Sequence, residues 1–97
     1  MFVCICWFDI RLLDKPESLK GKRHIVKSLK DRIRNKFQVS VSEVGSNDLW
    51  QRLELGIVCV YNDNTLAEQV YTQILNMLDS EPGLEVLDQF FEIQKVK

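Results

Sequence analysis

The sequence predicts an α+β fold of the ferredoxin-like type, in which a four-stranded antiparallel sheet carries two helices on one face. The chain has 97 residues, which fits one domain spanning residues 1–97. Its apolar periodicity follows the order strand, helix, strand, strand, helix, strand, which is the order of two interleaved βαβ halves. Two helices are also too few to cover both faces of a parallel sheet, so the antiparallel arrangement is favoured.

Residues 2–13 are predicted to form the first strand. Asp9 and Arg11 share its odd-numbered side, so the even-numbered side chains are expected to face the core. The odd-numbered side still carries three apolar residues, namely Val3, Ile5 and Trp7. Apolar surface on an open sheet face favours a partner. We therefore expect a homodimer through this face, with a small-ligand site between the sheets as the alternative.

A long helix is predicted next. Pro16 ends the first strand, and Ser18 is a suitable N-cap for a helix that runs to about residue 36. Apolar residues at helical spacing give this helix one stripe that is expected to pack on the sheet. The stripe consists of Val26, Leu29 and Ile33, with Ile25 on its flank and Leu19 at the start of the helix.

A second strand is predicted at residues 37–44, and three more elements are predicted after it. Residues 53–61 are expected to form the third strand, where Gly56 indicates a bulge or a close backbone approach. Thr65 and Glu68 fit a capping box that opens a second helix, which ends near residue 79. Residues 84–93 are predicted to form the last strand.

The charge distribution is strongly asymmetric although the net charge is only −1. Nine basic and two acidic residues lie between Lys15 and Lys36, whereas residues 37–97 contain three basic and ten acidic residues. On the first helix, five basic side chains fall within an arc of about 80° and are expected opposite the apolar stripe. They are Lys20, Arg23, Lys27, Lys30 and Arg34. Their mutual repulsion costs the helix roughly 1–2 kcal/mol, and Asp31 is the acid placed to relieve Lys27.

This basic helix predicts a docking site for RNA phosphates. The alternatives are a solvated face that the acidic half of the chain partly neutralises, or a contact with an anionic protein. Base reading across the sheet is not expected, because the third strand lacks the central aromatic pair of an RNA-recognition motif and Trp7 alone makes no stacking platform. Sequence-specific readout of DNA is not expected either.

The connection before the third strand is a second candidate contact. Its residues Trp50, Gln51 and Arg52 place an aromatic ring beside a cation. Trp50 could stack on a base while Arg52 meets a phosphate. The alternative is that Trp50 covers the end of the core and Arg52 pairs with Glu54 or Glu43.

No recognisable catalytic site, cofactor motif or metal motif is present in the sequence. His24 is the one histidine and is expected on the surface. The three cysteines are expected to be buried inert thiols, with a redox or metal role as the alternative. The apolar N-terminus lacks a basic leader and a cleavage site, and no segment is long enough to span a bilayer. We therefore expect a cytosolic protein with no membrane partner.

Three segments together resemble one known family. They are residues 18–34 (SLKGKRHIVKSLKDRIR), residues 37–44 (FQVSVSEV) and residues 48–52 (DLWQR) with Leu55 and Gly56. These segments resemble the first helix, second strand and hairpin of the YlxP-like family, the domain of unknown function 503. The resemblance implies a ferredoxin-like bacterial cytosolic protein and implies no reaction. Members are often encoded beside translation and ribosome-maturation factors, so it also implies ribosomal RNA or a ribosome-assembly particle as the partner.

Overall fold

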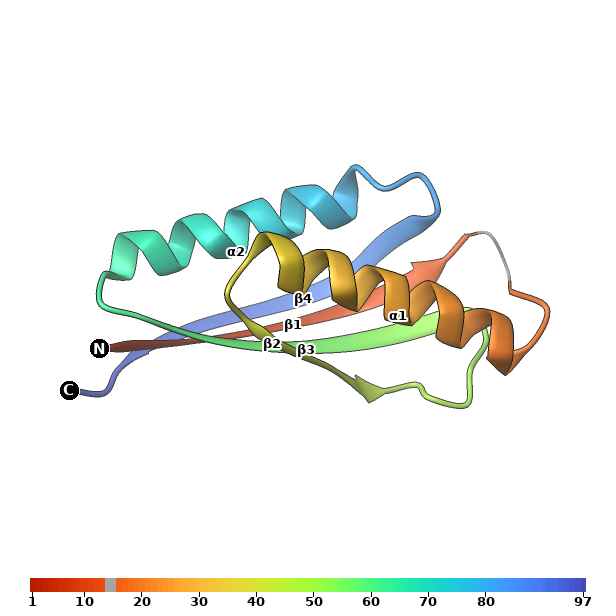
Figure 1. The fold of residues 1–97 in the computed structure, drawn as a ribbon, viewed down its shortest axis with the longest axis horizontal. Coiled ribbons are helices and arrows are strands. Elements are labelled where there is room, and N and C mark those ends of the chain that lie inside the picture. The colour runs from red at the N-terminus through yellow and green to blue at the C-terminus, as the bar shows by residue number, and fades with distance from the viewer. Residues whose placement is uncertain (14–15) are drawn as a thin grey trace.

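The computed structural model describes residues 1–13 and 16–97, and its elements follow the predicted order (Figure 1). The elements are β1 (Phe2–Leu12), α1 (Leu19–Lys36), β2 (Ser40–Gly45), β3 (Arg52–Tyr61), α2 (Asn64–Asp79) and β4 (Leu84–Lys95). The four strands form one antiparallel sheet in the order β2-β3-β1-β4. The predicted ferredoxin-like arrangement is therefore confirmed.

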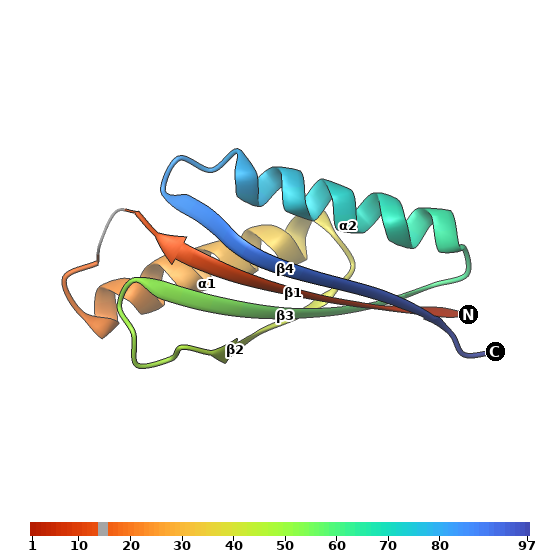
Figure 2. The ribbon, with the colours of Figure 1, turned by 180° about the vertical axis from the view of Figure 1, so that it is seen from behind.

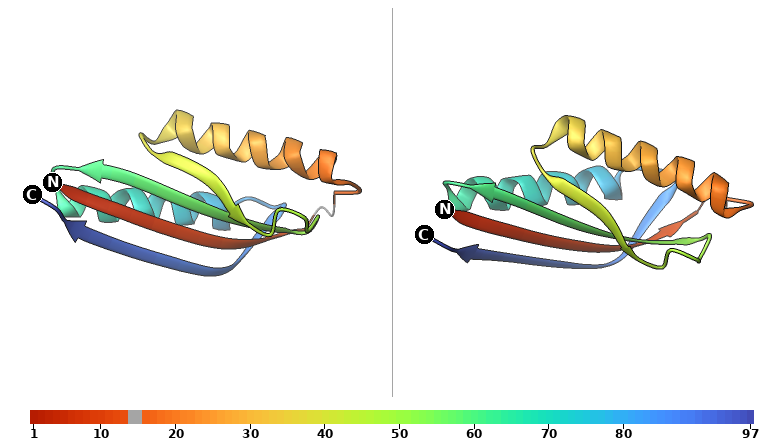
Figure 3. Two further views of the ribbon diagram at one scale, coloured as in Figure 1. Left: turned by 90° about the horizontal axis from the view of Figure 1, so that it is seen from below. Right: turned by 60° about the horizontal axis from the view of Figure 1, so that its bottom comes forward.

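Both helices cover the same face of this sheet. Seen from behind, the central strands lie in front of α1 (Figure 2), and seen from below the strands lie in front of α2 (Figure 3, left). The opposite face of the sheet has no helix over it within the described residues. The protein thus has two chemically separate sides, a helical side and an open sheet side.

The core lies between the sheet and the helices, as the periodicity predicts. The even-numbered side chains of β1 from Cys4 to Leu12 are buried, and they meet the buried stripe of α1. That stripe is formed by Val26, Leu29 and Ile33, with Ile25 packed at its edge. The second helix contributes Ala67, Val70, Ile74 and Leu78.

Two predicted element boundaries are corrected. The second strand begins at Ser40 and not at Phe37, because the Phe37 N–H still donates to the Ile33 carbonyl oxygen at 2.9 Å and caps α1. The predicted capping box at Thr65 is wrong. Asp63 is the N-cap of α2, and its carboxylate accepts the Thr65 N–H at 2.8 Å.

The irregularity expected at Gly56 lies in the neighbouring strand. The β2–β3 register shifts between Glu43 and Gly45, which leaves Val44 as an extra residue in β2. A Cβ atom at Gly56 would lie 2.8 Å from Val44 Cγ1. A side chain at position 56 would therefore force the bulged valine side chain to move.

Candidate nucleic-acid interface

The rotation of α1 on the sheet decides which of its side chains reach solvent. Ser18 is the N-cap, and its Oγ accepts the Gly21 N–H at 3.0 Å. Burial of Val26, Leu29 and Ile33 then fixes the helix orientation for all 18 residues. The predicted basic side chains therefore have a defined position relative to the sheet.

The five predicted cations lie on the flank of α1 and not opposite its apolar stripe. At 100° per residue, the centre of the basic arc is only about 100° from the centre of the stripe. The side directly opposite the core carries His24, Ser28, Asp31 and Asn35. His24 is exposed there, as expected. The basic arc instead faces β2 and the connection from β2 to β3.

This flank borders a groove between α1 and the β2–β3 connection. The hollow has a volume of about 520 Å³. Four of the five predicted cations line it, namely Arg23, Lys27, Lys30 and Arg34. Lys20 is exposed in the first turn of α1 and lies outside this lining. We call the surface formed by the groove and Lys20 the α1 groove.

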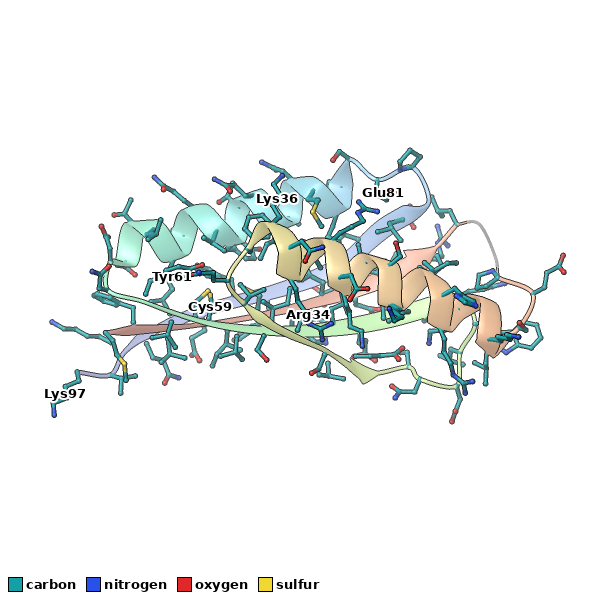
Figure 4. All side chains as sticks on the ribbon, viewed as in Figure 1. Arg34, Lys36, Cys59, Tyr61, Glu81 and Lys97 are labelled. Carbon is teal, nitrogen blue, oxygen red and sulfur yellow. The ribbon has the colours of Figure 1, made fainter. Side chains whose placement is uncertain are left out.

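Three carboxylates line the groove, and Asp31 is the one that pairs with cations of the basic arc. Asp31 lies 3.2 Å from Lys27 Nζ and 3.6 Å from an Arg34 guanidinium nitrogen. Arg34 also donates to the carbonyl oxygen of Val41 in β2 at 2.9 Å, and Figure 4 shows Arg34 reaching down from α1. Within residues 1–13 and 16–97, no carboxylate lies within 4.0 Å of Lys20, Arg23 or Lys30. The concentrated positive charge is thus only partly neutralised.

Lys22 is a buried cation of α1 that lies outside the predicted basic arc. It is only 2% exposed, and its Nζ donates to the carbonyl oxygens of Ser46 at 2.7 Å and Asn47 at 3.4 Å. Glu43 Oε2 lies 3.1 Å away, close enough for an ion pair although the geometry does not make a hydrogen bond. The helical periodicity contains the signal, because Lys22 falls inside the apolar stripe. Lys22 therefore forms the floor of the α1 groove and holds the β2–β3 connection against the helix.

The three side chains of the predicted recognition hairpin lie along one shallow hollow. Trp50 is 48% exposed and does not cover the core. It lines this hollow with Gln51 and Arg52, and the hollow shares Asp48 with the α1 groove. Arg52 also makes a two-point ion pair with Asp9 on β1, at 2.5 and 3.2 Å. The partner is neither Glu54 nor Glu43, and Arg52 is already committed within the fold.

The three cysteines are buried side chains in the core. The Sγ atoms of Cys4 and Cys6 are 3.7 Å apart, and Cys59 lies opposite Cys4 in the sheet. Burial raises the pKa of Cys4 and Cys59 to about 12 and that of Cys6 to about 11. The thiols therefore stay protonated at neutral pH. In the part of the chain that the structure describes, no group of three or more side chains is arranged to hold a metal ion.

Comparison with known proteins identifies relatives. The family profile described as "Protein of unknown function (DUF503)" matches residues 3–90. The chain is 41% identical over 68 residues to "Uncharacterized protein YlxP" from Bacillus subtilis (strain 168), which covers 70% of this chain and 74% of that protein. In shape it is similar to the de novo designed protein LFR1 1 with ferredoxin fold. The TM-score is 0.54 and the identity 13%, with 99% of this chain and 88% of the designed chain covered.

Proposed function

The chain belongs to the DUF503 family, whose description names no activity, and we propose that this protein is a non-enzymatic module that docks on RNA through the α1 groove. The proposed partner is ribosomal RNA or a ribosome-assembly particle, and the proposed location is the cytosol. No helix among the described residues is long and apolar enough to cross a membrane.

The single observation that carries this proposal is the density of poorly neutralised cations along one flank of α1. Of the five lysine and arginine side chains, Lys27 and Arg34 pair with Asp31, and the other three have no carboxylate within 4.0 Å among the described residues. Like-charge neighbours at this spacing destabilise a helix, so a polyanion that occupies the groove would offset a cost the free protein carries. Phosphate oxygens are the acceptors that lysine and arginine side chains pair with most strongly in RNA.

The arrangement supports contact with the RNA backbone rather than reading of its bases. Phosphate contacts position a protein on nucleic acid without carrying sequence information. Trp50 and Gln51 lie at the end of the groove that Asp48 borders, where an exposed indole can stack on one unpaired base. We therefore propose a preference for RNA with unpaired nucleotides and little preference for sequence.

The proposal is tested by charge reversal at two cations that have no carboxylate partner within the described residues. Arg23→Glu/Lys30→Glu changes the groove and leaves the Lys27–Asp31 ion pair intact. The matched control is Lys95→Glu/Lys97→Glu, which changes the net charge equally at the exposed C-terminal end. Binding is measured by fluorescence anisotropy with labelled single-stranded fragments of ribosomal RNA.

Loss of two phosphate contacts is expected to weaken binding at least about 10-fold at 0.1 M salt in the groove variant. The control variant is expected to lose at most a few-fold. Equal losses in the two variants would show that only net charge matters and would contradict docking through the α1 groove.

A further inference from the structure

The open side of the sheet carries an apolar patch that is larger than the three β1 residues predicted for it. The β1–β4 register places Phe90 directly beside Trp7, and the β1–β3 register places Gly56 on the other side of Trp7. Phe90 is 50% exposed. The sequence suggested that Trp7 is the one aromatic side chain on this face, but Phe90 is its neighbour there.

The patch extends along the strands toward the chain termini. Ile5 pairs with Val58, and Val3 pairs with Val60. Val58 and Val60 are both exposed. We call this surface the sheet patch, and it consists of Val3, Ile5, Trp7, Val58, Val60 and Phe90.

A row of carboxylates crosses the sheet immediately beside the patch. Asp9 is flanked in register by Glu54 on β3 and Asp88 on β4. Asp9 pairs with Arg52. Glu54 accepts hydrogen bonds from Trp7 Nε1 at 3.2 Å and from the Ser46 hydroxyl at 2.7 Å. Asp88 has no cation within 4.0 Å among the described residues.

Glu92 adds a further negative charge on the β4 side, because it pairs in register with Ile5. It too has no cation within 4.0 Å in the described part of the chain. Arg11 does not compensate these charges, since it forms its own ion pair with Glu85. The open sheet side is thus apolar in its centre and negative at its margin, the reverse of the α1 groove.

These charges discriminate between the possible occupants of the patch. RNA is repelled by the carboxylates. A second copy that docked with its own sheet would bring the same unpaired carboxylates to the interface. A second copy that docked with the basic flank of α1 would offer cations but no apolar surface, because the apolar stripe of that helix is already buried. A matching surface needs apolar side chains beside lysine or arginine.

We propose that the sheet patch is a docking site for a cationic amphipathic segment of another protein. The apolar side chains of that segment would cover Trp7 and Phe90, and its lysine or arginine side chains would pair with Asp88 and Glu92. Apolar and aromatic side chains bordered by charged residues are the usual arrangement of a protein interface. The site is separate from the α1 groove, so the protein could hold an RNA and a protein partner at the same time.

The probe for this site is a synthetic amphipathic peptide of leucine and lysine, with a leucine–glutamate peptide of the same pattern as the negative control. A Trp50→Phe background leaves Trp7 as the only tryptophan, so its emission reports the patch directly. The test variants are Phe90→Ser and Asp88→Lys/Glu92→Lys. The matched charge control is Glu68→Lys/Asp79→Lys, at exposed positions of α2.

The leucine–lysine peptide is expected to shift Trp7 emission to the blue and to bind at least 10-fold more weakly to both test variants than to the α2 control. The Arg23→Glu/Lys30→Glu variant is expected to bind the peptide as the parent does, even if RNA binding fails. Equal peptide affinity for Asp88→Lys/Glu92→Lys and the control would overturn the proposal. So would a peptide-free dimer in sedimentation equilibrium that dissociates in Phe90→Ser, because the occupant would then be a second copy.

Discussion

Lys22 Nζ donates a hydrogen bond of 2.7 Å to the carbonyl oxygen of Ser46, and this bond joins α1 to the β2–β3 connection. Ser46 has a φ of 58°, a left-handed conformation that costs free energy for a residue other than glycine. Its hydroxyl also donates to Glu54, which accepts the Trp7 indole N–H. One turn residue thus contacts groups that belong to both the α1 groove and the open sheet side.

Removing the Lys22 ammonium is expected to destabilise the fold. Lys22→Met keeps a side chain that fits the apolar stripe but leaves two carbonyl oxygens and Glu43 without their cation. Because Glu43 keeps 22% of its side-chain surface exposed, we expect a loss of about 2–3 kcal/mol rather than the full cost of a completely buried pair. Urea unfolding measures the change. Lys20→Met is the control, and it should change the free energy of unfolding by less than about 0.5 kcal/mol.

Removing the carboxylate of Asp31 is expected to strengthen RNA binding. Asp31→Asn releases Lys27 and Arg34 from their shared acid, which adds about one effective cation to the α1 groove. One further phosphate contact raises affinity about 5-fold at 0.1 M salt. Asp79→Asn on α2 makes the same charge change away from the groove and should gain much less. A weaker or unchanged affinity in Asp31→Asn would argue that the groove does not meet phosphates.

The buried thiols predict a loss of stability at alkaline pH. In the unfolded chain the thiols ionise near their ordinary pKa of 9.0, whereas burial raises the pKa of Cys4 and Cys59 in the fold to about 12. Above pH 9 the unfolded chain therefore binds fewer protons than the folded chain, and the free energy of unfolding falls as pH rises. Burial raises the pKa of Tyr61 and Tyr71 too, which acts in the same direction.

The measurement is urea unfolding between pH 8 and pH 11 under reducing conditions. A Cys4→Ala/Cys6→Ala/Cys59→Ala chain should show a shallower decline, provided that it still folds. At pH 8 the native thiols should resist alkylation by iodoacetamide and react only in denaturant. Rapid alkylation of native Cys4 or Cys59 would contradict the buried, protonated state.

The bulge in β2 predicts a coupled pair of substitutions. Gly56→Ala should lower stability by about 1–2 kcal/mol, because the three atoms nearest to an added Cβ all belong to Val44. Val44→Ala alone removes an exposed side chain and should cost less than about 0.5 kcal/mol. If the clash is with Val44, the double variant recovers most of the loss, and a double-mutant cycle measures that coupling. Purely additive effects would place the strain elsewhere.

The order of elements and the core were predictable from the sequence because they depend on local periodicity. The alternation in β1 and the stripe of α1 both follow from spacing alone. Side-chain partners across the sheet were not predictable in this way. Arg52 lies directly opposite Arg11 on β1 but pairs with Asp9, which is two residues away from Arg11 on the same face of the sheet. A strand pattern says which face a residue occupies but not which residue lies beside it.

The position of the basic arc shows the same limit. Its residues could be grouped by their angular spacing, but their relation to the groove depends on how α1 is turned on the sheet and where the β2–β3 connection passes. The neighbour of Trp7 depends on the register of β4, which shifts between Asp9 and Ile10 of β1. That irregularity has no sequence signal as clear as a glycine or proline, so the position of Phe90 required the structure.

The salt dependence of RNA binding tests the central claim most directly. If four or five side chains of the α1 groove meet phosphates of single-stranded RNA, a plot of log K against log salt concentration should have a slope between about −2.8 and −3.5. In the Arg23→Glu/Lys30→Glu variant, the magnitude of this slope should be smaller by about 1.4. A slope shallower than about −1 for the unmodified protein, or the same slope in both proteins, would contradict docking on RNA through this helix.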